Sequence, residues 1–132
     1  MQITKQADYG IRAMRYLARQ GTGQRVATSI VAREMRIPPS FLAKIVGQLS
    51  IAGLLRTSRG SRGGVSLGRA PKDISVLQVV EAIDGPIMLN QCAESTHDCA
   101  VKDQCQVHPI WQEVQETLVA RLGATRFDAS LN

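Results

Sequence analysis

The amino-acid sequence predicts a mainly α-helical fold that contains one small β-hairpin. Apolar residues recur at spacings of three and four in several segments, most of which end at glycine or proline. Two short alternating runs flank a glycine-rich stretch near the middle of the chain, as the strands of a hairpin do. All three cysteines lie in one polar loop between two helical segments. A chain of 132 residues is long enough for one domain with a modest core.

Residues 4–20 are predicted to form the first helix. Gly21 is expected to end it, because glycine is common just after a helix C-terminus. Asp8 lies on the polar side and is expected to pair with Arg12, one turn further along. The apolar stripe of this helix consists of Ala7, Ile11, Met14, Leu17 and Ala18.

Residues 25–53 are predicted to form two helices joined by a tight turn. Thr28 or Ser29 is expected to cap the first, and the prolines after Ile37 must end it. The second helix is predicted over 39–52 and begins with Pro39 in its first turn. Its inward side chains are expected to be Phe41, Leu42, Ile45, Val46 and Leu49. This arrangement indicates a helix-turn-helix, although two core helices with a few surface bases would give a similar pattern.

The next segment favours DNA binding over that alternative. Residues 54–58 and 65–69 are expected to be strands that bracket a glycine-rich basic tip, 59–64. Such a hairpin is the wing of a winged helix-turn-helix, and arginines at its tip suit a narrow minor groove. The candidate DNA-binding residues are Thr28, Ser29, Pro39, Ser40, Lys44, Gln48, Arg59, Ser61 and Arg62.

The remaining helices divide the rest of the chain. Ser75 is expected to cap a helix over 76–84, and a last helix runs from Pro109 to about Leu122 with a broad apolar face. This face predicts packing against a second copy in a two-fold homodimer, with docking onto the chain's own core as the alternative. The predicted units are a winged helix-turn-helix domain (1–84), a cysteine-rich loop (85–108), and a dimerisation helix with a short tail (109–132).

The charge is strongly segregated along the chain. Residues 1–70 hold twelve Lys and Arg against two acidic residues, whereas residues 71–132 hold four against nine. The overall net charge is +5. The basic half therefore suits a polyanion such as double-stranded operator DNA. The sequence contains no apolar run of membrane-spanning length and no signal-peptide pattern, so we expect a cytoplasmic protein that acts neither at a membrane nor on a small-molecule substrate.

The three cysteines form a C-x6-C-x5-C pattern at Cys92, Cys99 and Cys105, with His108 close behind. Several thiols in one coreless polar loop indicate a metal or an iron–sulfur cluster. The spacing is looser than in most structural zinc sites, so zinc is the weaker candidate. Unliganded thiols and a redox disulfide remain alternatives. A Cys105–His108 enzyme is a remote one, because no third orienting group is evident.

The predicted winged helix followed by three clustered cysteines resembles bacterial regulators of the Rrf type. That family includes the iron–sulfur regulator IscR, the nitric oxide sensor NsrR and the iron regulator RirA. The resemblance implies dimeric DNA-binding regulators whose affinity depends on an iron–sulfur cluster. The gap between the first two cysteines is one residue longer than in IscR-like members, and Ala43 stands where some relatives carry Glu, so no relative's operator can be transferred. The segments that carry the resemblance are 1–5, 8–14, 40–42, 53–55, 59–64, 77–84, the three cysteines and 108–111.

The resemblance also implies two candidates for the fourth cluster ligand. IscR-like proteins have a histidine at the position of His108, which suits a two-iron cluster (2Fe–2S). NsrR-like proteins have an aspartate at the position of Asp8, which the partner subunit contributes to a four-iron cluster (4Fe–4S). Both residues are present here. We favour His108 and the two-iron cluster, because Asp8 has Arg12 as a local partner.

Overall fold

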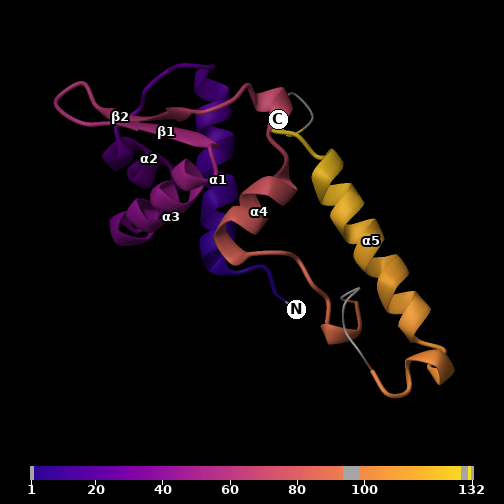
Figure 1. Ribbon diagram of the computed structural model, residues 1–132. Helices are drawn as coiled ribbons and strands as arrows, with labels where there is room; N and C mark the ends of the chain where they lie inside the picture. Colours follow the sequence, from indigo (N-terminus) through magenta and orange to yellow (C-terminus); the bar gives the residue numbers. More distant parts are fainter. Residues whose placement is uncertain (1, 94–98, 129–130, 132) are drawn as a thin grey trace.

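The computed structural model of the chain describes all residues except 1, 94–98, 129–130 and 132. The predicted mainly helical fold with one hairpin is confirmed (Figure 1). Its elements are α1 (Lys5–Gln20), α2 (Thr28–Met35), α3 (Pro39–Ile51), β1 (Leu55–Ser58), β2 (Gly64–Leu67), α4 (Val76–Asp84), α5 (His108–Ala124) and the 3-10 turns η1 (Pro71–Asp73), η2 (Gln91–Ala93) and η3 (Lys102–Gln104).

Helix α1 begins where Thr4 caps it. The Thr4 hydroxyl accepts a hydrogen bond from the backbone N–H of Ala7 at 3.1 Å. The backbone N–H and hydroxyl of Thr4 both donate to the carboxylate of Asp84, which ties the start of α1 to the end of α4. Ala7, Met14 and Leu17 of the predicted stripe are buried, so this stripe is the face that packs into the core.

Helices α2 and α3 form the helix-turn-helix. The expected cap by Thr28 or Ser29 is wrong, because Thr28 is already the first helical residue and Ala27 stands at the cap position without a side-chain hydrogen bond. Arg36 makes the turn in the left-handed region with φ of 53°. Its neighbour Ile37 then donates its backbone N–H to the carbonyl of Ala32 at 2.9 Å.

Helix α3 begins at Pro39, as predicted, and buries one face. Leu42, Ile45, Val46 and Leu49 are buried, but the prediction that Phe41 points inward is wrong. Phe41 is 42% exposed and packs edge-on against the Tyr9 ring of α1, with ring centroids 6.1 Å apart. Phe41 lies one residue before the buried Leu42. Because successive helical residues are rotated by about 100°, the Phe41 side chain points away from the core.

The hairpin is held to the helical part by a backbone bridge. Val26 and Val65 exchange two N–H···O hydrogen bonds of 2.9 and 2.8 Å just before α2 begins. Gly64 has a φ of 151°, and a Cβ there would lie against the carbonyl of Val26. Glycine is therefore required at this position, and the wing is fixed at its base.

Helix α4 is the centre of the packing. Ser75 caps it as predicted, in a capping box: the Ser75 hydroxyl accepts from the N–H of Gln78 at 3.1 Å, and the Gln78 side chain accepts from the N–H of Ser75 at 2.9 Å. Val79 and Val80 are buried, and α4 contacts α1, α3 and α5.

The segment after α5 is part of the core, whereas the sequence predicts only a short tail. Thr125 accepts a hydrogen bond from the N–H of Val76 at 2.9 Å, and Phe127 donates to the carbonyl of Ile74 at 3.1 Å. Phe127 is only 2% exposed. The segment after α5 thus returns to the start of α4, and Phe127 becomes part of the core.

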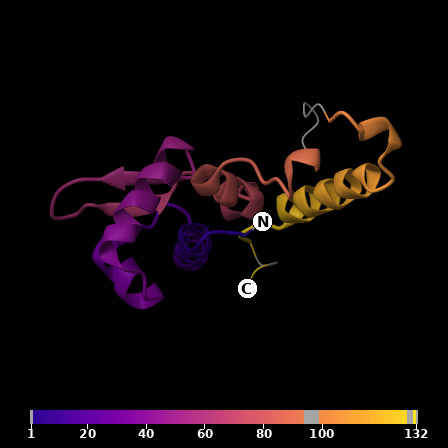
Figure 2. The same ribbon diagram turned by 90° about the horizontal axis from the view of Figure 1, so that it is seen from below.

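Helix α5 extends away from the other helices. Its C-terminal end lies against α4, and its N-terminal end lies near the cysteine-bearing segment (Figures 1 and 2). Both views place the tip of the hairpin and the cysteine-bearing segment at opposite ends of the molecule. Within the described residues, no helix is both long enough and apolar enough to cross a bilayer.

Candidate DNA-binding surface and cysteine site

The start of α2 and the start of α3 present polar side chains to solvent. Thr28 and Ser29 are exposed on α2, and Pro39, Ser40 and Lys44 are exposed on α3. Because α2 has no side-chain cap, its first backbone N–H groups are available to a phosphate oxygen, and the helix dipole favours an anion there. These elements can therefore hold the backbone of a nucleic acid while α3 presents side chains to its bases.

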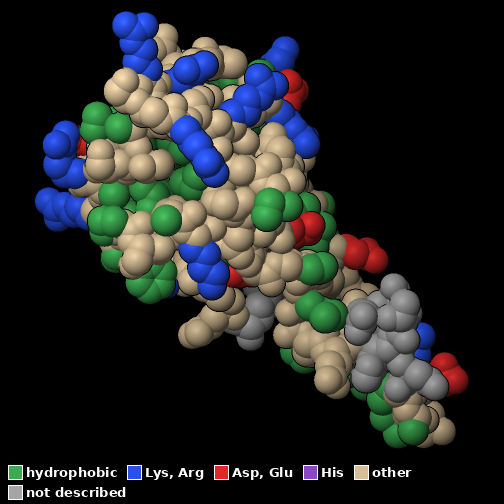
Figure 3. All heavy atoms as spheres, turned by 60° about the vertical axis from the view of Figure 1, so that its left-hand side comes forward, with side chains coloured by type: hydrophobic (Ala, Val, Ile, Leu, Met, Phe, Trp, Pro, Cys, Tyr) green, Lys and Arg blue, Asp and Glu red, His purple; other side chains and the backbone are tan. Residues whose placement is uncertain are grey.

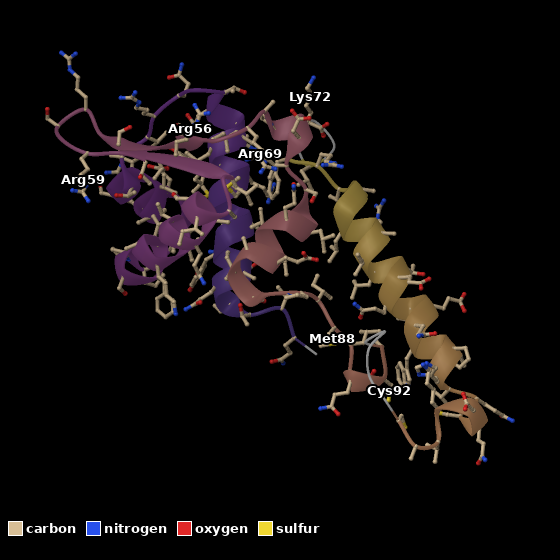
Figure 4. The ribbon with its side chains drawn as sticks, in the orientation of Figure 1. Arg56, Arg59, Arg69, Lys72, Met88 and Cys92 are labelled. Atoms are coloured by element: carbon tan, nitrogen blue, oxygen red, sulfur yellow. The ribbon has the colours of Figure 1, made fainter. Side chains whose placement is uncertain are left out.

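The wing carries the expected cations at its tip. Arg59, Ser61 and Arg62 are exposed, and Figure 4 shows Arg59 on the loop between the two strands, far from the cysteine-bearing segment. A shallow hollow of about 280 Å³ lies between the wing base and the start of α2 and is lined by Thr28, Thr57 and Ser58 among others. The wing and the helix-turn-helix thus share one polar surface.

Two side chains change the list of candidates. Gln48 is half-buried and donates its amide N–H to the carbonyl of Ile83 on α4 at 3.4 Å, so part of its hydrogen-bonding capacity is used within the chain. Arg56 on β1 is also exposed, although it was not among the DNA-binding residues predicted from the sequence. Neighbouring side chains of a strand point to opposite faces, so the burial of Leu55 could have predicted that Arg56 is exposed. Lys and Arg side chains stand around hydrophobic ones on the face drawn in Figure 3.

Asp8 makes contacts within its own helix. Its carboxylate lies 2.9 Å from the guanidinium of Arg12, which confirms the expected pair, and 3.5 Å from the Lys5 ammonium. The same Arg12 donates to the carbonyl of Met35, the last residue of α2, at 3.1 Å. Asp8 therefore faces two cations, and one of them holds the end of the first helix-turn-helix element.

The three cysteines lie on different short elements of one segment. Cys92 is in η2, Cys99 follows the undescribed residues 94–98, and Cys105 ends η3; all three are half-buried free thiols. His108 is the first residue of α5, and its Nε2 is buried without a hydrogen-bond partner among the described residues. A buried imidazole nitrogen without a partner and soft thiol sulfurs suit a metal-containing group.

The described part of one chain does not bring these donors together. No group of three His, Cys, Asp or Glu side chains within it is close enough to hold a metal ion. The cysteine-bearing segment contacts α5 through η2 (Figure 4). Gln115 of α5 also fixes the preceding segment, because its side-chain amide donates to the carbonyl of Ile87 and accepts from the N–H of Leu89 at 2.9 Å.

A family model named Rrf2 and described as an iron-dependent transcriptional regulator matches residues 3–130. The chain belongs to the Rrf2 family. Rrf2 proteins are DNA-binding transcriptional regulators and not enzymes, which agrees with the exposed helix-turn-helix and wing and removes the remote Cys–His enzyme.

Similar proteins agree with this assignment. An HTH-type transcriptional regulator of Mycobacterium tuberculosis (strain CDC 1551) is 39% identical over 87 residues, which cover 66% of this chain and 54% of that protein. The chain thus spans about half the length of the curated relatives that it matches.

The fold is shared with solved regulators of low sequence identity. CymR, titled the global cysteine regulator of B. subtilis, has a TM-score of 0.81 at 23% identity and covers 100% of this chain and 98% of its own. IscR of T. potens has a TM-score of 0.75 at 23% identity over 99% of this chain and 86% of its own. These likenesses show the Rrf2 fold.

Proposed function

We propose that this Rrf2 regulator binds operator DNA as a homodimer and that an iron–sulfur cluster controls its affinity for that operator. Cys92, Cys99, Cys105 and His108 would hold the cluster, which supplies a centre sensitive to oxidants, nitric oxide and iron supply. The observation that carries this proposal is the buried Nε2 of His108, unpartnered among the described residues, at the start of α5.

The surface described above fits a DNA duplex. The N-terminal part of α3 would enter the major groove with Ser40 and Lys44, and the start of α2 would meet a phosphate. Arg59 and Arg62 of the wing would reach the adjacent minor groove. In a two-fold dimer, two such α3 helices would lie about one DNA turn apart, roughly 34 Å.

A second copy of the chain would cover the exposed face of α5. The structure describes α5 throughout, and none of its residues is buried. Ile110, Trp111 and Val114 are 53%, 38% and 45% exposed, while Leu118 and Leu122 of the same stripe pack against the chain's own core. Apolar side chains at this spacing favour a helix partner, and two-fold symmetry provides an identical one.

The chain's own residues can connect the cysteine segment to the DNA-binding unit. His108 starts α5, Gln115 ties α5 to the segment after α4, and the end of α5 returns to α4 through Leu122. Order in the segment 92–108 would therefore fix the direction of α5 and, through the dimer, the spacing of the two α3 helices. A differential stabilisation of about 1–3 kcal/mol would change DNA affinity by about 5–150-fold.

Anaerobic purification followed by iron, sulfide and absorption measurements tests the cluster. We expect stoichiometric iron and sulfide and a change in operator affinity after chelation. Single substitutions of Cys92, Cys99 or Cys105 with Ala should remove both, whereas the control Gln104→Ala, an exposed residue of the same segment, should keep both. A colourless protein whose operator affinity is indifferent to chelators would overturn the proposal.

A thiol switch is the second candidate. It is favoured by the three free thiols on separate elements. The fold shared with B. subtilis CymR, titled a global cysteine regulator, and with Staphylococcus aureus CymR, solved in an oxidised form, also favours it. A cysteine-bound zinc ion is the metal counterpart of this alternative. Metal analysis separates the three, because zinc brings no sulfide and a thiol switch brings neither metal nor sulfide.

A further inference from the structure

A hollow of about 420 Å³ lies between α2 and α3, beside the residues proposed to contact DNA. Ala32, Leu42 and Val46 line it and are buried or nearly so. At its rim stand Thr28 and Ser29 of α2 and the exposed Ala43 of α3. The hollow is thus apolar inside and polar at the edge, on a surface that is otherwise built for an anion.

The charge around this hollow decides what can occupy it. Lys44 follows Ala43 on α3, and the first N–H groups of α2 are free of a side-chain cap. Arg33 lines the hollow on α2 and also contacts the carboxylate of the exposed Glu34 at 3.4 Å. These features favour an occupant that has negative charge outside the hollow and an apolar group that projects into it. Duplex DNA has this combination in its major groove, because each thymine projects a 5-methyl group between the two phosphate backbones.

We propose that Ala43 and the hollow beside it recognise thymine 5-methyl groups and so determine part of the operator sequence. This inference rests on the proposed docking of α3 in the major groove. A methyl group takes about as much room as a water molecule, roughly 30 Å³. The hollow of about 420 Å³ therefore has ample room for one. Ala43 has no hydrogen-bonding side-chain group, so apolar contact is the means by which it can distinguish thymine from cytosine.

Thymine-to-deoxyuridine replacement tests the proposal on the DNA side. Duplexes that the protein selects from a random pool would first define its preferred site, and each thymine of that site would then be replaced singly with deoxyuridine. This change removes the methyl group and keeps the base-pairing edge. We expect one to three thymines per half-site at which affinity falls about fourfold, the value for one buried methyl group.

Substitution of Ala43 tests the protein side. In Ala43→Ser a hydroxyl replaces a hydrogen of the methyl group that faces the thymine, so the deoxyuridine penalty at the sensitive positions should fall to less than twofold. The matched control is Ala120→Ser, an exposed alanine of α5, which should keep the full penalty. A circular dichroism spectrum unchanged from that of the parent protein would show that both variants are folded.

Three outcomes would decide against the proposal. Deoxyuridine penalties below twofold at every thymine of the selected site would overturn it, and so would penalties that Ala43→Ser leaves unchanged. If octanoate lowered operator affinity while no thymine was methyl-sensitive, the hollow would be a site for small apolar anions instead. Failure to select any preferred duplex would overturn the proposed function itself, which separates that result from the other three.

Discussion

The contacts within one chain favour His108 over Asp8 as the fourth ligand of the proposed cluster. The Asp8 carboxylate is paired with Arg12 and Lys5 and is 51% exposed. The Nε2 of His108 is buried and has no partner among the described residues. Recruiting Asp8 to a metal would break two ion pairs, whereas recruiting His108 would satisfy a nitrogen whose burial is otherwise unfavourable.

Substitution of these two residues therefore should have unequal effects. We expect His108→Ala to lose most of the bound iron, or to change the visible absorption spectrum, because it removes the proposed fourth ligand. Asp8→Ala should retain iron and spectrum and alter only local stability, by less than about 1 kcal/mol for exposed pairs. Anaerobic iron analysis and absorption spectra measure both, and the reverse order of effects would identify Asp8 as the ligand.

The cap of α4 gives a prediction that is independent of the cofactor. Ser75 is buried and makes both halves of a capping box with Gln78. We expect Ser75→Ala to lower the free energy of unfolding by about 1–2 kcal/mol. Urea denaturation followed by circular dichroism measures this. Ser66→Ala, a half-buried serine of β2, is the control, and equal losses in the two variants would contradict the special role of the cap.

At the scale of elements, short-range patterns predicted most of the fold. The stripe of α1, the proline at the start of α3 and the alternation around Leu55 each follow from local geometry. The sequence did not predict the exposure of Phe41, because its partner Tyr9 lies on another helix. It also did not predict that Phe127 completes the core, since that depends on where α5 ends in space.

The candidate DNA-binding surface also has features that one element predicts and features that depend on how two elements pack. Exposure of Ser40, Lys44 and the wing arginines follows from the pattern of each element alone. The turn of Gln48 towards Ile83 depends on the position of α4, which no spacing within α3 reveals. The hollow beside Ala43 likewise requires α2 and α3 together.

The exposed arginines of the wing lead to a prediction about the salt dependence of DNA binding. Arg59 and Arg62 are exposed on a hairpin whose base is fixed by Val26, so each can contact a phosphate without refolding the loop. Arg59→Ala and Arg62→Ala should each weaken DNA binding and reduce the slope of log K against log salt by about 1. Titrations at several salt concentrations measure this. Lys102→Ala, far from the wing, is the control, and an unchanged slope in the wing variants would exclude phosphate contacts by the tip.

At the scale of the whole molecule, the two functional regions lie apart. The wing and the cysteine-bearing segment occupy opposite ends of the chain, and the described part of one chain does not gather a complete set of metal ligands (Figures 1 and 2). Helix α5 contacts η2 at one end and α4 at the other. In the proposed mechanism, a change at the cysteines would therefore reach the DNA-binding unit through α5 or through a partner subunit.

Substitution within the exposed apolar stripe of α5 tests the proposed homodimer. An aspartate at Val114 would place a charge in the centre of the proposed dimer interface, between Trp111 and Leu118, where desolvation strongly disfavours it. We expect Val114→Asp to raise the dimer dissociation constant at least tenfold, as measured by analytical ultracentrifugation over a range of concentrations. Ala120→Asp adds the same charge on the far side of α5 and should leave the dimer intact. If both variants remained equally dimeric, another surface would join the subunits, and α5 would act within its own chain. If Val114→Asp yields monomers that still bind single half-sites through α3 and the wing, then α5 supplies the spacing of the two α3 helices and not the contacts with DNA.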